Sequence, residues 1–217
     1  MTDPTPDVQH LIDPDDAWTL IQEWAAESPN PVTFLPADPD RAARTLAGLR
    51  VSTRSALGAL ALHCGGVVAD SGWFRLLGGG TDELPDLMTA SAERLPGAVV
   101  VGYDALGGTF AVDGGGLRVA PGEVCYFGPD SLSWGGLGGG HGAFVQAVLT
   151  GALGASFDSL RWPGWQEEVA ALSLDQGLSL WPPPFSDEGR DVAAASRRPV
   201  PIDELLTFYA QAAAQLG

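Results

Sequence analysis

The feature that most constrains the fold is a change of texture at Gly65-Gly66. From there to Trp134 the chain consists of short β-type runs between glycine-rich turns, often spaced about ten residues apart. The runs are Val67-Val68, Trp73-Phe74-Arg75-Leu76, Ala98-Val99-Val100-Val101, Thr109-Phe110-Ala111-Val112, Leu117-Arg118-Val119 and Val124-Cys125-Tyr126-Phe127. They do not alternate regularly with helical segments. The pattern therefore predicts an antiparallel meander rather than a parallel sheet with crossover helices.

Segments with helical spacing of apolar residues lie on both sides of this region. We expect helices from Asp13 to about residue 27 and over 38–49, 53–63, 84–95, 144–149, 165–172 and 202–209, with a short extended run at 32–35. The prediction is an α+β fold, a central antiparallel sheet flanked by N-terminal and C-terminal helices. We divide the chain into a flexible acidic lead (1–13), an α+β core (14–155) and a helical and extended C-terminal extension (156–217) that packs on the core.

Charge excludes several classes of partner. The chain has 27 acidic residues and 11 basic ones, all arginine, for a net charge of −16. Such a chain has no general attraction for phosphate backbones or anionic lipid, so we expect neither nucleic acid nor membrane as a partner. The first residues lack the basic and apolar regions of a signal peptide, and no apolar run reaches a membrane-spanning length. We expect a soluble protein in the cytoplasm.

The glycines, histidines and cysteines of the chain do not occur in the patterns that nucleotide, metal or thiol sites require. The glycine clusters are not followed by Lys-Ser or Lys-Thr, since the chain has no lysine, and this excludes a P-loop. The histidines and cysteines show no metal-binding spacing; they are His10, His63, His141, Cys64 and Cys125. We therefore predict no metal site and no cofactor, with the cysteines as buried structural residues.

Carboxylates at the predicted strand ends leave two interpretations open. Asp70, Asp104, Asp113 and Asp130 each lie in or beside a predicted turn. Aspartate at such positions usually accepts hydrogen bonds from nearby backbone N–H groups and so forms the turn. The other interpretation is a hydrolase in which Asp104 acts with Asp70 or Asp130 in a pocket lined by Trp73, Tyr103 and Trp134. No GxSxG nucleophile motif is present.

Tryptophan is in excess, with seven in the chain. Most should lie in the core, because each ring buries a large apolar area. One or two at the rim of a surface would suit a binding site, where tryptophan and arginine are enriched. The segment Trp73-Phe74-Arg75 is one place where the two residue types occur together.

Six segments resemble an uncharacterised bacterial family, domain of unknown function 2625. They are TRSALGAL (53–60), GGVVADSGWFRLLGGG (65–80), DALGGTFAVDGGG (104–116), YFGPDSLSW (126–134), LRWPGW (160–165) and SRRPVPIDEL (196–205). The resemblance covers about residues 15–210 in order. The family name implies no activity.

The order of elements also resembles the SUKH superfamily more distantly. The matching positions are Leu35-Pro36, Gly65, Gly66, Trp73, Asp104, Gly107, Gly108 and Phe110. This resemblance implies an α+β fold and a non-catalytic protein-binding module, since many members are immunity proteins that neutralise toxins. The chain departs from it beyond about residue 155, which has no counterpart. It also has Tyr103 where proteins of the 2625 family often carry a second acidic residue beside the Asp104 position, which puts a two-carboxylate mechanism in doubt.

Two classes of function follow, with a third alternative. The leading hypothesis is a non-catalytic, immunity-type module that binds a protein partner, for instance a basic toxin attracted by the acidic chain. The alternatives are a small-substrate hydrolase around Asp104 and a structural or regulatory homodimer. We predict no catalytic residue, and the candidate partner-binding or ligand-binding residues are Asp70, Trp73, Arg75, Tyr103, Asp104, Asp130 and Trp134.

Overall fold

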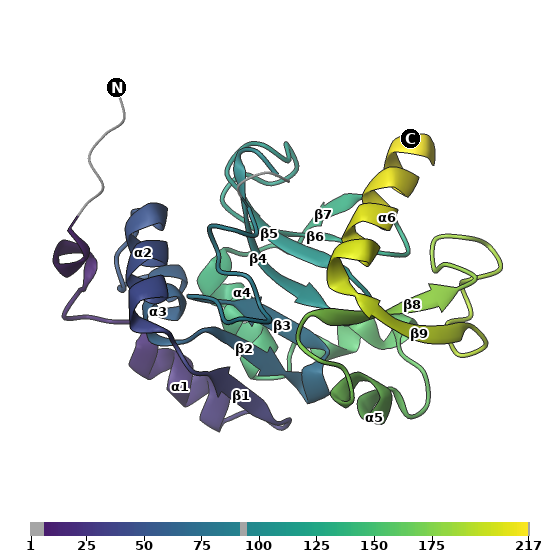
Figure 1. Cartoon of the computed structure of the whole chain (residues 1–217), viewed down its shortest axis with the longest axis horizontal. Helices are drawn as coiled ribbons and strands as arrows, with labels where there is room; N and C mark the ends of the chain where they lie inside the picture. The colour runs from purple at the N-terminus through teal and green to yellow at the C-terminus, as the bar shows by residue number, and fades with distance from the viewer. Residues whose placement is uncertain (1–6, 92–94, 217) are drawn as a thin grey trace.

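A single antiparallel sheet forms the centre of this computed structural model, which describes residues 7–91 and 95–216 (Figure 1). Its seven strands follow one another in chain order, each hydrogen-bonded to the next. They are β1 (Val32–Leu35), β2 (Gly66–Ala69), β3 (Phe74–Leu77), β4 (Ala98–Asp104), β5 (Thr109–Asp113), β6 (Val124–Phe127) and β7 (Trp134–Gly136). The predicted α+β class with an antiparallel sheet is therefore confirmed.

Helices cover one face of this sheet, which we call the helix face. The elements on this side are α1 (Trp18–Ala26), α3 (Ala56–His63), α4 (His141–Leu149) and the 3₁₀ segment η3 (Gly154–Leu160), with α2 (Pro39–Leu49) packed on α3. The core between them is aromatic, because Phe110 of β5 lies 4.9 Å from Phe144 of α4 and 5.9 Å from Phe157 of η3, measured between ring centroids. Burial of such rings is the main stabilising term of this layer.

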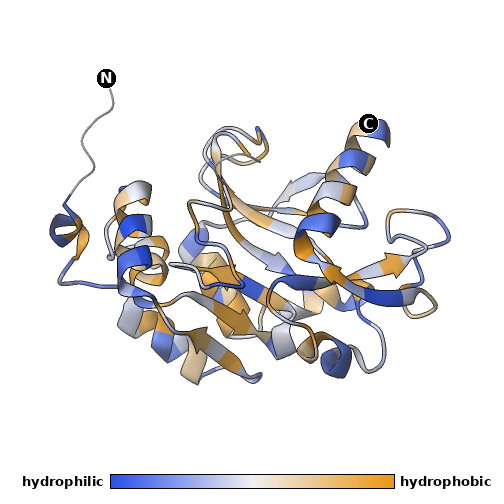
Figure 2. Cartoon of the chain, viewed as in Figure 1, coloured by the Kyte–Doolittle hydropathy of each residue, from blue (hydrophilic) through white to orange (hydrophobic). Residues whose placement is uncertain are grey.

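The last quarter of the chain supplies a second layer on the opposite face, which we call the cleft face. After the short helix α5 (Trp165–Ala170) the chain forms a hairpin of β8 (Gln176–Trp181) and β9 (Ser196–Pro201), and it ends in α6 (Ile202–Leu216). Figure 1 shows the hairpin and α6 together, with α6 standing beside the sheet. In Figure 2 the hydrophilic colour is prominent on β9, whereas the strands of the sheet carry much of the hydrophobic colour.

A buried arginine joins the hairpin to the sheet. The guanidinium of Arg75, on β3, donates hydrogen bonds from Nη1 to the carbonyl oxygens of Leu174 and Gln176 at the start of β8. The side chain is almost fully buried, and burial lowers the pKa of Arg75 to about 10, an effect that Asp104 and Asp175 partly oppose. A second link is the hydrogen bond of 2.8 Å from the Leu178 N–H to the Ala105 carbonyl.

Asp113 explains why the strand expected at residues 117–119 is absent. Its carboxylate accepts hydrogen bonds from four backbone N–H groups, those of Gly115, Leu117, Val119 and Ala120, at 2.7 to 3.1 Å. These groups are therefore used in a turn and cannot pair with a strand. Burial acts to raise the pKa of Asp113, but the four donors outweigh it and lower the pKa.

Other differences from prediction lie at helix starts and in the hairpin. The first helix begins at Trp18 rather than at Asp13, because the Asp13 carboxylate accepts from Asp15 N–H in a separate turn. The helix expected over 84–95 is wrong for residues 84–91, which form turns, and its positions 92–94 lie outside the described residues, as do residues 1–6 of the lead. Strand β9 was not predicted, because Arg197, Arg198 and two prolines hide its alternation.

Within residues 7–91 and 95–216, none of the helices is by itself both long enough and apolar enough to cross a membrane. Of these elements, only α4 and η3 taken together have the length and apolar composition of a span, and a bend of 74° separates them.

Replacement of Arg75 by methionine should loosen the C-terminal layer. Methionine keeps much of the length of the side chain but leaves two buried carbonyl oxygens without their donor, which should lower the free energy of unfolding by about 2–4 kcal/mol. Urea unfolding measures the loss, and amide exchange at Leu178 should accelerate. Arg198→Met, at an exposed arginine of β9, is the matched control and should stay within about 0.5 kcal/mol of wild type. Equal effects of the two changes would contradict the role given to Arg75.

Candidate functional site

One row of side chains crosses the cleft face from edge to edge. Residues that face each other in neighbouring antiparallel strands project to the same side of a sheet, so the register identifies the row. Its members, in strand order, are Thr33, Val68, Arg75, Tyr103, Thr109, Phe127 and Trp134. The row therefore places Arg75 beside Tyr103, and it ends in an aromatic pair, Phe127 and Trp134, whose centroids are 5.5 Å apart.

The first half of α6 is held close to this face. Leu205 and Tyr209 are buried against the loop after β4 and against β8. A larger residue is disfavoured at both contact points, because a Cβ on Gly107 would lie 2.8 Å from Leu205 Cβ, and one on Gly177 would lie 3.0 Å from the Ala105 carbonyl oxygen. The backbone conformation of Gly107, with φ of +87°, also favours glycine.

The second half of α6 leaves a space over the sheet. Ala210, Ala213 and Ala214 recur at the i, i+3, i+4 spacing of one helix face, and their side chains are too short to reach the strands. The result is a cleft of about 660 Å³ between α6 and the row, which we call the α6 cleft. This volume is typical of small-ligand and peptide sites. Its lining is mainly apolar and aromatic and consists of Ala90, Leu95, Val100, Tyr103, Gly107, Thr109, Phe127, Trp134, Leu206, Thr207, Tyr209, Ala210, Gln211, Ala213 and Ala214.

A second hollow adjoins the α6 cleft and has a different chemistry. Its volume is about 400 Å³, and it shares Ala90 and Tyr103 with the cleft as lining residues. The described residues that line it include four carboxylates, those of Asp82, Glu83, Asp175 and Asp203, and no basic residue. We call this space the acidic hollow. Together the two spaces form an apolar trough with a negatively charged end.

Asp104 lies on the helix face, away from both hollows. It faces Phe74 in the strand register, and its side chain is fully buried. Oδ1 accepts hydrogen bonds from the N–H groups of Leu106 and Gly108, both at 2.8 Å, and Oδ2 accepts one from the Tyr126 hydroxyl at 2.6 Å. The carboxylate therefore closes the β4–β5 turn, as the turn-forming interpretation predicts.

Close packing around Asp104 shifts its acidity and excludes other residues. Burial raises the pKa of Asp104, and the hydrogen bonds from Tyr126, Gly108 and Leu106 offset only part of that rise. Burial and the neighbouring Asp104 also raise the pKa of the Tyr126 phenol well above its usual value. A Cβ on Gly108 would lie 2.1 Å from Asp104 Oδ2, so only glycine fits there.

Asp70 and Trp73 lie in a separate region, the turn between β2 and β3. Asp70 accepts a hydrogen bond of 2.8 Å from Asn30 and forms an ion pair of 2.5 Å with Arg161, which is also largely buried. The guanidinium carbon of Arg161 lies 4.7 Å from the Trp73 ring centroid and 4.2 Å from that of Trp165. Cation–π contact therefore reinforces the ion pair, which holds Asp70 in a backbone conformation with φ of +53°.

The structure therefore separates the predicted site residues into groups. Tyr103 and Trp134 line the α6 cleft, and Arg75 belongs to the same row but is buried under the hairpin. Asp70, Trp73 and Asp104 do not line the cleft, and Asp130 is exposed in the turn after β6. Sequence reasoning missed Phe127, Tyr209 and the alanines of α6. Alternation in β6 and the Ala-rich end of the chain were the signals available for them.

Thiol and metal chemistry find no support in the arrangement of the described residues. Both cysteines are buried, and burial raises the pKa of the Cys64 thiol to about 12. His63 is hydrogen-bonded to Asp16 at 2.8 Å, and burial lowers the pKa of His141 to about 4. No three of the described His, Cys, Asp and Glu side chains are grouped to hold a metal ion.

Comparison with known proteins identifies the family. The profile of the family described as "Protein of unknown function DUF2625" matches residues 8–205, so the chain belongs to this family. The uncharacterized protein YbfG of Escherichia coli (strain K12) is 36% identical over 172 residues, covering 77% of this chain and 80% of YbfG. An uncharacterized protein of Haemophilus influenzae is 30% identical over 185 residues, covering 81% of each chain. No solved structure matches the chain.

Asp104→Asn should change how stability depends on pH. A raised pKa means that the native state binds the Asp104 proton more tightly than the unfolded state does. Wild-type stability, taken relative to the variant, should therefore be greatest below about pH 4, the usual pKa of aspartate, and should fall as the pH rises until the native carboxyl ionises. Urea unfolding of both proteins between about pH 3.5 and pH 8 measures this difference and cancels other titrations. A difference that instead rises with pH above about 4 would show that the hydrogen bonds outweigh burial.

Proposed function

We propose that this member of the family is a non-catalytic protein-binding module that takes up part of its partner in the α6 cleft. The observation that carries the proposal is the α6 cleft itself, which is aromatic and apolar and lies on the cleft face of the sheet. Tyr103, Phe127, Trp134 and Tyr209 supply large rings with few rotatable bonds, and such residues dominate the energetics of protein interfaces. Small apolar side chains of a partner would fill the space over Ala210 and Ala213.

Binding is favoured over hydrolysis by the positions of the carboxylates. A two-carboxylate mechanism needs both groups to face a substrate in one pocket. The Asp104 carboxylate is bonded to two backbone N–H groups and Tyr126, while that of Asp70 is paired with Arg161. Neither residue lines the α6 cleft, whose described lining contains no carboxylate.

The finer form of the proposal is an immunity-type role. The net charge of −16 supports a basic partner, such as a toxin, because long-range attraction speeds the encounter. The proposal includes a distant relation to the SUKH superfamily, which the meander and the position of Gly107-Gly108 after β4 support. It also includes a cytoplasmic location, a reducing compartment in which the two free thiols persist.

Photo-crosslinking tests the binding role. A benzoylphenylalanine at position 211, where Gln211 lines the cleft, should form an adduct with a partner protein in cells of the source organism. The same probe at exposed Gln22 on α1 is the control and should not form that adduct. Ala213→Phe, which fills the cleft, should reduce the adduct at position 211 by about tenfold or more. An adduct that is absent, or that survives filling of the cleft, would overturn the proposal.

A homodimer is the second candidate, and one observation favours it. Trp181 at the end of β8 is 70% exposed, which is unusual for so large an apolar ring, and Phe208 of α6 is 42% exposed. A second copy could cover these rings.

Light scattering at micromolar concentration tests the homodimer. A dimer should have twice the mass of the 22.5 kDa chain, and Trp181→Ser should return it to a monomer. A monomeric wild type would exclude this candidate at that concentration.

A further inference from the structure

We propose that the occupant of the α6 cleft is a short segment of the partner protein in which one basic side chain adjoins about four apolar residues. The apolar residues lie in the α6 cleft, and the basic side chain enters the acidic hollow. This inference rests on the proposed function and specifies the chemistry that the site selects.

The two spaces are neighbours with opposite character. Ala90 and Tyr103 line both of them, so a ligand that fills the cleft as far as Tyr103 reaches the wall of the acidic hollow. Carboxylates line only the hollow, whereas the rings of Phe127, Trp134 and Tyr209 and the alanines of α6 line only the cleft. A purely apolar ligand would leave the hollow in water, and an anionic ligand would meet repulsion there.

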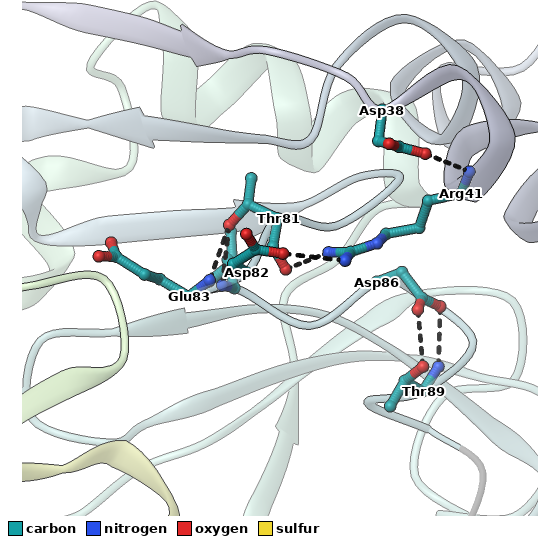
Figure 3. Close-up of polar contacts among 8 residues, drawn as sticks. Asp38, Arg41, Thr81, Asp82, Glu83, Asp86 and Thr89 are labelled. Carbon is teal, nitrogen blue, oxygen red and sulfur yellow. Dashed lines mark hydrogen bonds and ion pairs between the residues drawn. The ribbon is translucent and has the colours of Figure 1, made fainter.

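The carboxylates of the hollow differ in how far they are already neutralised. Asp82 forms an ion pair of 3.1 Å with Arg41, whose guanidinium also donates to the Thr81 carbonyl (Figure 3). The Glu83 side chain points away from this pair, and it forms no ion pair with the described arginines. Asp175 accepts a hydrogen bond from the Ser173 hydroxyl at 2.5 Å and remains exposed. Glu83 is therefore available to a cation, and exposed Asp175, whose charge also acts on the buried Arg75, adds negative charge beside it.

The turn that carries Glu83 is held in place before any ligand binds. The Thr81 hydroxyl oxygen accepts hydrogen bonds from the N–H groups of Glu83, at 3.2 Å, and Leu84, at 2.9 Å. Further along, Asp86 accepts from the N–H and hydroxyl groups of Thr89 at 2.9 and 2.6 Å, which Figure 3 also shows. A preorganised turn reduces the entropy lost on binding and so favours recognition of a charge at one place.

The length of the cleft fixes the length of the apolar part. The lining residues of α6 run from Leu206 to Ala214. Eight steps along a helix cover about 12 Å, which four residues of extended chain also span. A peptide segment suits this site better than a detergent-like molecule, because Thr109, Thr207 and Gln211 place polar groups along the trough that can bond a backbone.

Calorimetry with three short peptides tests the inference. The first is acetyl-Arg-Val-Leu-Val-Leu-amide, the second replaces arginine by neutral citrulline, and the third replaces the four apolar residues by serine. At low salt, wild-type protein should bind the first peptide about tenfold more tightly than the second, and the third should give no detectable heat.

Three protein variants assign the effects to the two spaces. The double variant Glu83→Gln/Asp175→Asn should lose most of the preference for arginine over citrulline, because it neutralises the two carboxylates assigned to the cation. Ala213→Phe should weaken both peptides by about tenfold, with Ala210→Leu as a milder filling variant should the first not fold. Glu23→Gln, at an exposed carboxylate on α1, is the matched control and should behave as wild type.

The outcomes separate this inference from the proposed function. Suppose that wild type binds the arginine and citrulline peptides equally and that Ala213→Phe weakens both. This result would overturn the proposed recognition of a basic side chain and leave apolar binding in the cleft intact. Retained preference for arginine in Glu83→Gln/Asp175→Asn would overturn the assignment to the acidic hollow. No binding of any peptide would overturn the inference as a whole, while the adduct at position 211 decides the proposed function independently.

Discussion

The architecture of the cleft face depends on the buried guanidinium of Arg75. A charged group in the middle of a sheet costs free energy unless its hydrogen bonds are satisfied, and here the carbonyls of Leu174 and Gln176 satisfy two of them. That contact fixes where β8 starts, the β8–β9 pairing fixes where β9 ends, and α6 begins at the next residue. The position of α6 over the sheet, and with it the α6 cleft, thus depends on this contact together with the packing of Leu205 and Tyr209 against the loop after β4.

The two faces of the sheet differ because alternate residues of each strand point to opposite sides, one set into the packed core and the other toward the cleft. On β5 and β6, Phe110 and Tyr126 point to the helix face and join a packed aromatic core with Phe157. Their neighbours Thr109 and Phe127 point to the cleft face and line an open space. Asp104 accepts a hydrogen bond from Tyr126 on the helix face, and Tyr103, one residue earlier, lines the α6 cleft on the other face.

Much of the fold could be predicted from the sequence, because its signals are local. Short β-type runs between glycines gave the meander, and apolar spacing gave α4, α5 and α6. The failures have local causes too: Asp113 accepts hydrogen bonds from the amides of Leu117, Val119 and Ala120 in a turn, and prolines conceal the alternation of β9. The candidate site was less accessible. Tyr103 and Trp134 were named as candidate residues, but the cleft they line exists only because alanines of α6, more than 100 residues beyond Tyr103, are placed over the strands.

The attachment of α6 has a mechanical consequence. The helix is fixed between Ile202 and Tyr209, whereas its last turns, beyond Ala210, stand over the space with mostly exposed residues. The helix is therefore anchored at its N-terminal end only, and its C-terminal turns have few packing contacts. The unsupported part is about 10 Å long, so a tilt of about 10° at the fixed end moves its tip by about 2 Å, roughly the difference in reach between small and large apolar side chains. A small tilt of the last turns of α6 would thus change the width of the α6 cleft without repacking the core of the sheet, so the proposed ligand segments could differ in bulk.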